Sequence, residues 1–537
     1  MGWEEIKRAR NLLSGEKGTI IKDWGGRVPV ALIYPNSYYL GMSCLGIHVL
    51  YRILNEHSRV VCERVFGERD CEGGLRPLIS LESQRPLSDF SVIAFSLSYE
   101  VDYINTVEII RASGLPIYAA DRDESHPLVI AGGPSISSNP APLSPFFDLL
   151  CIGEAEPILE NLIPLLVGTI GDKRDEILKA LSQVPGIYLP QGHRKDVTVL
   201  QRVENLDAYP ATSTVLTRNT ELGNMYLIEV GRGCNWGCRF CLVGNSFRPA
   251  NFRSTDTLTE QAKVGSRHRN RVGLIGPAVT DHPEIEKLLS NLGKMDTELS
   301  VSSLRMRPLS RFLLGELARS RVKSVAFAPE AGSSRLRNLI RKSLSDEDIL
   351  EAVDTVAGLG IKQIKLYFMI GLPSETDRDI EDIVRLVTES KRIVDRKRSG
   401  TRIILKVAPF IPKAHTPLQW LPMARPEQLN HSLTLMRKSL PKKGIRVKSE
   451  SPAWSQIQAV LSRGDGNISR VLAAVNGLSL SGWREAVASC GIDVDFYAHH
   501  NWHTDAGLPW SMIETARNND QLKLEAKRSL DVPGDKS

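Results

Sequence analysis

Short apolar runs alternate with stretches of helical periodicity along the first third of the chain. The strand-like runs fall at residues 28–34, 91–96, 116–119, 128–131 and 149–152. Apolar positions at helical spacing follow the first run at 46–55 and the second at 103–112. Strands that alternate with helices predict an α/β fold with a parallel, doubly wound, Rossmann-like sheet. Ligands of such sheets bind beyond the carboxyl ends of the strands.

A second alternating series begins after residue 220. Its six strand-like runs fall at residues 225–230, 271–275, 298–302, 324–328, 363–369 and 402–407. Helical stretches such as 345–357 and 377–394 separate them. This series predicts an open, partial (β/α)6 barrel, and functional groups of such barrels lie at the carboxyl ends of the strands.

After Pro422 the strand signals fade and the period becomes helical. A chain of 537 residues is too long for one compact core, so we expect several domains. We expect a helical extension over residues 1–27, the Rossmann-like domain over 28–195, a linker over 196–220, the partial barrel over 221–424, and a small, mostly helical C-terminal domain over 425–537.

Composition and charge change this picture little. The chain is 42% hydrophobic and 24% charged, which is ordinary for a soluble globular protein. Its net charge of +6 permits an anionic substrate or RNA without arguing for either. The first residues predict an amphipathic helix, and no signal peptide or long apolar run follows it. We therefore expect a cytoplasmic protein with no membrane partner.

Three of the eight cysteines gather directly after the first expected barrel strand. Cys234, Cys238 and Cys241 lie on one glycine-rich loop, with three and then two residues between them. Thiolates at this spacing can bind three irons of a 4Fe–4S cluster. No fourth cysteine lies nearby, so one iron would stay open, as in a catalytic metal site.

Two other interpretations of these cysteines were weighed. A zinc site needs a fourth ligand, and the nearest downstream histidine is His268. A disulfide between two of the thiols is disfavoured in a reducing cytoplasm. We therefore favour the iron–sulfur interpretation.

The Cys-x3-Cys-x2-Cys spacing, with the aromatic Phe240 before the third cysteine, resembles the motif of the radical S-adenosylmethionine (SAM) superfamily. The resemblance implies that the open iron binds the amine and carboxylate of SAM. It also implies reductive cleavage of SAM to a 5′-deoxyadenosyl radical, an external flavodoxin- or ferredoxin-like reductant, and anaerobic operation.

Other expected strand ends carry residues that the resemblance places near SAM. Gly276 stands where members of the superfamily often carry Gly-Gly-Glu, but the glutamate is missing here. Arg305 is a candidate partner of the substrate carboxylate, and Glu330 of the ribose hydroxyls. The candidate contacts are Phe240, Gly276, Ser303, Arg305, Glu330 and Gly371, with Arg305 and Glu330 as candidate catalytic residues. Ordinary strand-end turns or surface ion pairs are the alternative at each position.

The N-terminal region resembles the cobalamin-binding domain that often precedes such a barrel. The positions that match its motifs are Asn36, Tyr38 and Gly41, then Ser96 and Ser98, then Gly132 and Gly133. Tyr38 replaces the histidine that binds cobalt, and Asn36 replaces the aspartate that orients it. The resemblance therefore implies cobalamin without a histidine ligand, and a purely structural sheet remains the alternative.

Three weaker signals lie elsewhere in the chain. His499, His500 and His503 invite a metal site, but a packed or solvated turn is the better interpretation. His415 follows the last expected barrel strand, where it is expected to cap or pack rather than to act on substrate. The basic run 391–402 is expected to be a hydrated face, with RNA contact as the alternative.

Together these features predict a radical SAM enzyme that transfers a methyl group from cobalamin to an unreactive carbon. Radical rearrangement, ring closure or RNA modification without cobalamin is the alternative. The expected substrate is a small molecule or RNA.

Overall fold

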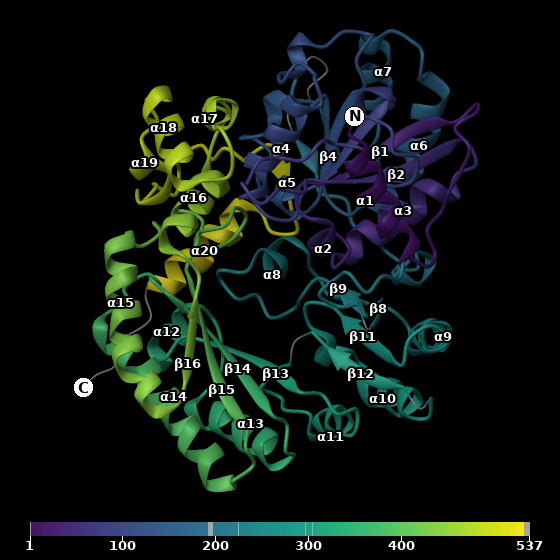
Figure 1. The fold of residues 1–537 in the computed structure, drawn as a ribbon. Coiled ribbons are helices and arrows are strands. Elements are labelled where there is room, and N and C mark those ends of the chain that lie inside the picture. Colours follow the sequence, from purple (N-terminus) through teal and green to yellow (C-terminus); the bar gives the residue numbers. More distant parts are fainter. Residues whose placement is uncertain (1, 192–196, 224, 296, 303, 531–537) are drawn as a thin grey trace.

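The computed structural model describes residues 2–191, 197–223, 225–295, 297–302 and 304–530. Figure 1 shows the N-terminal sheet above the barrel, with the C-terminal helices beside both. The predicted fold class is confirmed: a mostly parallel α/β sheet comes first and a partial α/β barrel follows. No helix of the described ranges is both long enough and apolar enough to cross a membrane.

The N-terminal sheet has the strand order β2-β1-β3-β4-β5-β6, parallel except for its last strand. Its strands are β1 (Val28–Tyr34), β2 (Val60–Phe66), β3 (Val92–Ser96), β4 (Leu128–Gly132), β5 (Leu149–Cys151) and β6 (Ile187–Tyr188). The chain reverses its direction of winding between β1 and β3, and the ends of these strands form the crevice typical of ligand binding in doubly wound sheets.

Three features of this sheet differ from the sequence prediction, and one is that the short antiparallel strand β6 was not predicted. The expected strand at 116–119 is wrong: this segment is a bend that leads into the short 3₁₀ helix Ala119–Asp121. Strand β2 was not predicted, because the charged pair Glu63-Arg64 interrupts its apolar run. Both of these side chains are nevertheless buried.

Helices cover both faces of the N-terminal sheet. Along β1, Val30 and Leu32 point to the face covered by α3 (Leu45–Glu56) and α6 (Ala155–Thr169). The alternate residues Ala31 and Ile33 belong to the cluster on the other face, which includes α4 (Asp102–Ala112). This period of two is the expected consequence of pleating in a doubly covered strand.

The barrel consists of two parallel sheets rather than one continuous wall. Its six predicted strands are all present, and their bounds are β8 (Tyr226–Glu229), β11 (Arg271–Ile275), β12 (Glu298–Val301), β13 (Ser324–Glu330), β14 (Gln363–Ile370) and β15 (Arg402–Pro409). One sheet has the order β12-β11-β8, and the other runs from β13 to β16 (Arg446–Ser449). Helices on the outside are α9 (Thr255–Ser266), α10 (Ile285–Gly293), α11 (Arg311–Arg319), α13 (Asp346–Gly358) and α14 (Asp377–Lys397).

The sequence does not predict β16, which lies beyond residue 424 yet pairs in parallel with β15. The barrel sheet therefore continues into the segment that we assigned to the C-terminal domain. The other domain bounds stay predictions.

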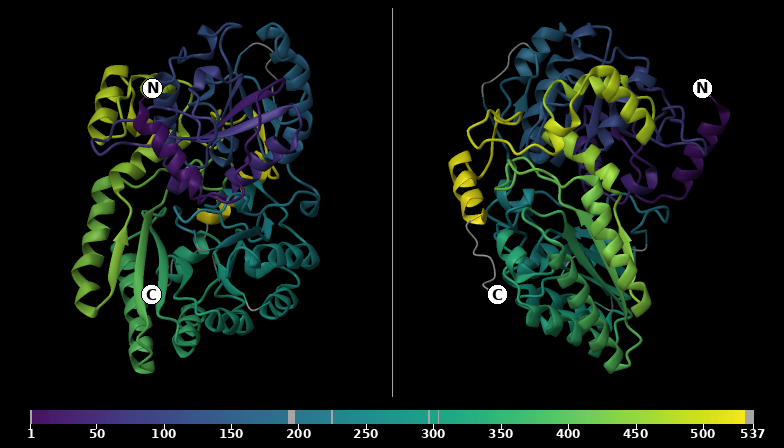
Figure 2. Two further views of the ribbon diagram at one scale, coloured as in Figure 1. Left: turned by 45° about the vertical axis from the view of Figure 1, so that its right-hand side comes forward. Right: turned by 90° about the vertical axis from the view of Figure 1, so that its left-hand side faces the viewer.

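The C-terminal region ties the N-terminal domain to the barrel. Its helices are α15 (Pro426–Ser439), α16 (Pro452–Arg463), α17 (Ile468–Ala474), α18 (Leu480–Cys490), α19 (Val494–Ala498) and α20 (Asn519–Leu530). Helix α17 packs on α4, and α20 packs on α12 (Ser334–Leu339). Strand β17 (Ile513–Glu514) pairs with β7 (Thr198–Val199), which follows the N-terminal domain. Two further views show these C-terminal helices beside both domains (Figure 2).

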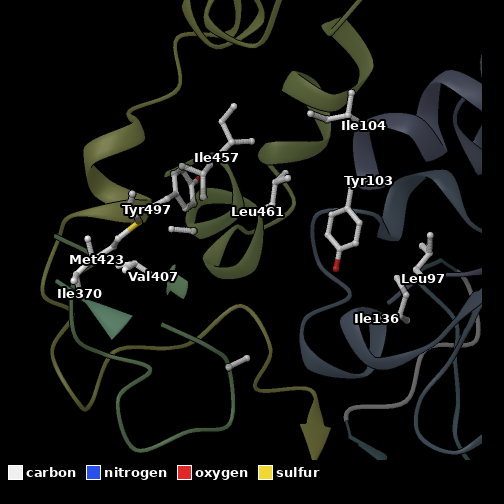
Figure 3. Close-up of a cluster of buried hydrophobic side chains, with 14 of the residues drawn as sticks. Leu97, Tyr103, Ile104, Ile136, Ile370, Val407, Met423, Ile457, Leu461 and Tyr497 are labelled. Carbon is white, nitrogen blue, oxygen red and sulfur yellow. The ribbon is translucent and has the colours of Figure 1, made fainter. Parts of the chain in front are cut away.

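One apolar core runs through all three regions. It includes Leu97 of the N-terminal domain, Leu461 of α16, and Ile370 and Val407 near the ends of β14 and β15 (Figure 3). Burial of these side chains removes apolar surface from water at about 25 cal/mol per Å². The three regions therefore share one core, which stabilises their arrangement.

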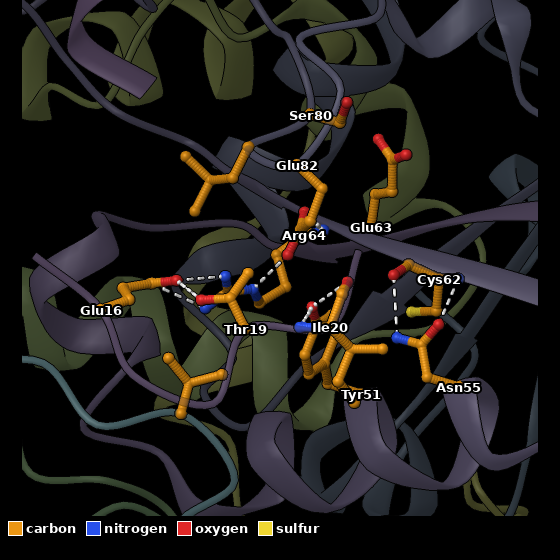
Figure 4. Close-up of polar contacts among 12 residues, drawn as sticks. Glu16, Thr19, Ile20, Tyr51, Asn55, Cys62, Glu63, Arg64, Ser80 and Glu82 are labelled. Carbon is orange, nitrogen blue, oxygen red and sulfur yellow. Dashed lines mark hydrogen bonds and ion pairs between the residues drawn. The ribbon is translucent and has the colours of Figure 1, made fainter. Parts of the chain in front are cut away.

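The buried cation Arg64 connects β2 to the N-terminal segment (Figure 4). Its guanidinium donates to Glu82 at 2.8 Å and to Glu16 at 2.6 Å, and all three side chains are buried. Burial alone would raise the pKa of Glu16, but the bonds and charge of Arg64 outweigh it and the pKa falls below its usual value. For Glu82 burial prevails, and its pKa is raised.

Replacing Arg64 should destabilise the N-terminal domain strongly. An Arg64→Met variant leaves two buried carboxylates without a cation, which costs about 3–5 kcal/mol of the free energy of unfolding. Urea denaturation followed by tryptophan fluorescence measures this loss. Exposed Arg59 is the matched control, and Arg59→Met should change stability by less than about 0.5 kcal/mol. Equal stability of the two variants would contradict the role of Arg64.

Candidate functional site

The carboxyl ends of the N-terminal strands meet those of the first barrel strands at a cavity of about 630 Å³. We call it the interface cavity. From the N-terminal domain it is lined by β1, β3, β4, α3 and α6, and from the barrel by the ends of β8, β11 and β12. Gly233, Leu242, Val243 and Phe247 of the cysteine-bearing loop also line it. The volume lies in the range of small-molecule and cofactor sites.

Five of the predicted site residues line this cavity. They come from three different strand ends and are Ser96, Ser98, Gly132, Gly133 and Gly276. The backbone of Gly133 is in a left-handed conformation (φ +115°), and a Cβ there would lie 2.3 Å from the carbonyl oxygen of Leu97. The protein's own backbone therefore already requires glycine at this position.

The other three positions of the cobalamin-like motif are absent from the cavity lining. The Tyr38 hydroxyl is buried and donates to the Glu16 carboxylate at 2.6 Å. A Cβ at Gly41 would lie 2.4 Å from the ring of Phe66. Asn36 donates to Asp102 at 3.0 Å. These contacts account for the three residues by packing and hydrogen bonding within the N-terminal domain.

A β-hairpin carries the cysteine loop. Strands β9 (Gly231–Arg232) and β10 (Asn251–Phe252) pair in antiparallel fashion and hold its two ends together. Gly233 and Gly237 both have positive φ, at +73° and +65°, which lets the loop turn tightly. The fully buried amide of Asn245 donates to the carbonyls of Cys238 and Cys241 at 3.0 and 2.8 Å.

The three cysteines fit a 4Fe–4S cluster better than the alternatives. All three are free and partly buried, so no disulfide joins them. Across the described ranges, no three Cys, His, Asp or Glu side chains gather tightly enough to hold one metal ion. A zinc site needs such a group, whereas thiolates on different irons of a cubane lie farther apart. Burial raises the pKa of Cys238 to about 11, so cluster binding must displace protons.

Arg305 lies beside the first cysteine and already has an anionic partner. Its guanidinium pairs with Asp281 at 2.8 Å, lies 4.0 Å from the ring centre of Trp236, and is 3.6 Å from Cys234 Sγ. Trp236 also donates to Asp281 at 2.6 Å. Sequence reasoning missed Asp281 and Trp236, although Trp236 lies inside the cysteine motif.

Glu330 ends β13 in a left-handed conformation (φ +70°) that non-glycine residues rarely adopt. Its carboxylate lies 3.3 Å from Lys342 Nζ. Burial raises the pKa of Glu330 despite this cation. The strained backbone and the largely enclosed carboxylate together are typical of functional positions.

The remaining predicted contacts lie in different surroundings. Phe240 packs against the apolar cluster that contains Leu336 and Leu372. Gly371 has a φ of +74°, and its N–H donates to Glu375 at 2.7 Å. Ser303 lies outside the described residues.

Within the described ranges, His499, His500 and His503 belong to no group that could hold a metal ion. His499 Nδ1 donates to the carbonyl of Met423, and its Nε2 accepts from the amide nitrogen of Gln456. His415 is buried, and burial lowers its pKa to about 4, so its ring is neutral at pH 7.

An ion-pair network at the cavity edge connects the two domains, and the sequence did not predict it. Arg232 forms a bidentate pair with Glu156 of α6, at 2.9 and 2.6 Å. The same guanidinium donates to Glu229 at the end of β8, at 2.9 Å. Planar, bidentate geometry makes this one of the stronger kinds of ion pair.

Two protein-family models match this chain, and one of them covers the cysteine loop. The N-terminal family model of radical SAM proteins matches residues 46–190, and the radical SAM superfamily model matches residues 228–387. The uncharacterized protein MJ0966 of Methanocaldococcus jannaschii is 32% identical over 82% of this chain and 90% of its own length.

More distant relatives match part of the chain. The ribosomal protein uS12 methylthiotransferase RimO of Rippkaea orientalis is 24% identical over 40% of this chain and 52% of its own length. The tRNA-2-methylthio-N(6)-dimethylallyladenosine synthase of Pelotomaculum thermopropionicum is 24% identical over 44% of this chain and 54% of its own length.

Among solved structures, the cobalamin-dependent SAM radical enzyme OxsB is 15% identical, with a TM-score of 0.49 over 67% of this chain and 51% of OxsB. This chain spans about half the length of OxsB and of the two methylthio-transferring relatives. The two family models together with the extensive identity to MJ0966 show that the chain belongs to the radical SAM superfamily of enzymes.

Proposed function

We propose that this radical SAM enzyme transfers a methyl group from cobalamin to an unreactive carbon of its substrate. One observation carries the proposal: a single cavity is lined both by the strand ends of the N-terminal sheet and by the cysteine loop of the barrel. A cofactor held by the first domain would therefore reach the place where the barrel makes its radical.

The cysteine loop supplies the first half of this chemistry. Cys234, Cys238 and Cys241 would hold the cluster, and SAM bound there supplies a 5′-deoxyadenosyl radical when an external donor provides one electron. Gly276, which faces the cavity, leaves room for a ligand close to the backbone. The partly exposed carboxylate of Glu330 would accept hydrogen bonds from ribose hydroxyls, and the Lys342 ammonium holds it in place.

Arg305 would position a neighbouring residue rather than only bind the substrate carboxylate. Its charge is already shared with Asp281, so its remaining effect falls on Cys234, which lies at 3.6 Å. This contact would hold the Cys234 side chain in a fixed place on the cysteine loop.

The interface cavity would hold cobalamin. Its walls are mostly aliphatic side chains of β1, β3, α3 and α6, which exclude water. Small residues such as Ser96, Ser98 and Gly132 leave space for a flat ring beside the strand ends. Because the Tyr38 hydroxyl is bonded to Glu16, this residue would not bind the metal.

RNA modification is the second candidate. The relatives named for methylthio transfer to tRNA or to a ribosomal protein match about two fifths of the chain, and this match supports a macromolecular substrate. In this case the barrel chemistry is the same, and the substrate differs.

Removing one cluster ligand should abolish SAM cleavage. A Cys238→Ala variant leaves two thiolates on the loop, so reconstituted iron should fall well below the about four atoms per chain of a full cluster. Anaerobic reductive cleavage of SAM should fall by more than about hundredfold, since even outer-shell changes cost 10–100-fold. Cys490→Ala, which removes a free and partly buried thiol in α18, is the matched control. Retained cleavage by Cys238→Ala would refute the cluster assignment.

Filling the interface cavity should prevent cobalamin binding. Ala94 of β3 lines the cavity, and an Ala94→Phe variant places a ring where the corrin or its tail would lie. We expect retention of hydroxocobalamin through gel filtration to drop at least tenfold, measured from its visible absorbance. Iron content and SAM cleavage should not change.

Ala112→Phe, at an exposed position on α4 over the opposite face of the sheet, is the control for this experiment. If wild-type protein retains no cobalamin, methyl transfer is excluded and chemistry without cobalamin takes its place. If Ala94→Phe binds cobalamin as wild type does, the cofactor lies elsewhere.

A further inference from the structure

Three arginine side chains converge on the outer side of the cysteine loop. A Cβ built at Gly237, next to Cys238, would lie 2.8 Å from Arg248 Nη1, 3.2 Å from Arg517 Nη2 and 3.8 Å from Arg341 Nη1. The three belong to the loop itself, to the segment before α20, and to the turn after α12. Segments far apart in sequence therefore place positive charge around Gly237 of the cysteine loop.

A single carboxylate faces this positive charge within the described part of the chain. Glu525 of α20 pairs with three cations, Arg239 at 3.3 Å, Arg341 at 3.4 Å and Arg528 at 2.8 Å. Arg248 and Arg517 donate to neutral oxygens, those of the Asn235 carbonyl at 3.0 Å and the Asn245 amide at 2.9 Å. Burial, and then the charge of Arg248, lower the pKa of Arg517. The surface thus carries a strong local excess of positive charge.

These side chains border a surface groove of about 480 Å³, which we call the α20 groove. Its lining residues include Arg248, Arg517, Gln521, Leu524 and Arg528, and none of its lining residues belongs to the interface cavity. Leu524 is 51% exposed in the middle of this basic surface. In the right-hand view of Figure 2, α20 lies at the outer surface of the molecule.

We propose that the α20 groove is the docking site of the electron donor, a small acidic electron-transfer protein of the flavodoxin class. Opposite charge steers such partners and raises association rates by 10–1,000-fold. An exposed apolar residue within a charged rim is the usual anatomy of an interface. The location fits the task as well, because electron tunnelling falls off steeply with distance and the groove borders the loop residue next to Cys238.

The electron balance of the step is simple. The anionic hydroquinone of flavodoxin gives up one electron and becomes the neutral semiquinone, and no proton is released. The cluster takes up the electron, and its charge falls from 2+ to 1+. No other oxidant or reductant is needed.

RNA is the other polyanion that a basic groove can bind, and the structure favours the protein partner. The groove shares no lining residue with the cavity at which the barrel opens, so RNA bound here would not present a base to the radical. A reductant has no need to reach that cavity.

The test uses the full chain and compares two charge reversals on one helix. Arg528→Glu changes the groove, whereas Lys527→Glu changes an exposed cation on the same helix that does not line the groove. Both alter the net charge equally. Binding of oxidised bacterial flavodoxin, measured by calorimetry at low ionic strength, should weaken at least tenfold in Arg528→Glu and less than twofold in Lys527→Glu. Leu524→Ala should also weaken binding.

Reduction kinetics supply a second measurement, made anaerobically on reconstituted protein. Flavodoxin hydroquinone should reduce Arg528→Glu at least tenfold more slowly than wild type, and added salt should remove most of this difference. Dithionite should reduce both proteins at the same rate. This inference rests on the radical SAM chemistry. If neither flavodoxin nor dithionite reduces the protein, the cluster assignment is wrong, and the docking proposal falls with it.

Two outcomes would overturn the docking proposal. Equal flavodoxin affinities of Arg528→Glu and Lys527→Glu would show that the groove is not the site. Loss of tRNA binding in Arg528→Glu, with flavodoxin binding unchanged, would assign the groove to nucleic acid instead.

Discussion

The common direction of parallel strands is the constraint on which this molecule depends. Parallel neighbours need crossover connections, which cover the faces of the sheet and leave the loops at one edge free. In this chain the carboxyl ends of the N-terminal strands meet the carboxyl ends of the first barrel strands. The bidentate pair between Arg232 and Glu156 holds the barrel against the N-terminal domain at this place. The interface cavity is the space that remains between them.

Most of the architecture could be predicted from the sequence, because the spacing of hydrophobic residues that distinguishes strands from helices is set within short stretches of chain. All six barrel strands and four of the strands of the N-terminal sheet coincide with predicted runs. Strand β2 could not be predicted, because Arg64 in its middle becomes compatible with burial only through Glu16 and Glu82. The expected strand at 116–119 illustrates the opposite error, since an apolar run alone does not fix the backbone conformation.

The sequence predicts two parts of the candidate site: the cysteines, which are neighbours in the chain, and five cavity-lining residues at three strand ends, which share one side because the strands are parallel. The cysteine spacing by itself marks the three residues that we propose as cluster ligands. The pairing of Arg305 with Asp281, by contrast, arises from two strand ends, and no local pattern shows it. The same holds for Glu330, whose left-handed backbone follows from a bulge in β13. Several glycines were expected because a ligand needs space. At Gly41 and Gly133, however, a side chain would already collide with Phe66 and Leu97 of the protein itself.

The hydrogen bonds of the cysteine loop have a consequence for the order of events during synthesis. Asn245 holds the carbonyls of Cys238 and Cys241, and its own oxygen accepts a bond from Arg517. Domains fold from the N-terminus while the ribosome still elongates the chain. The cysteine loop is synthesised well before residue 517, so its full set of hydrogen bonds forms only after residue 517 has left the exit tunnel. Iron–sulfur assembly machinery therefore meets the fully hydrogen-bonded loop only after the segment that carries Arg517 has been synthesised.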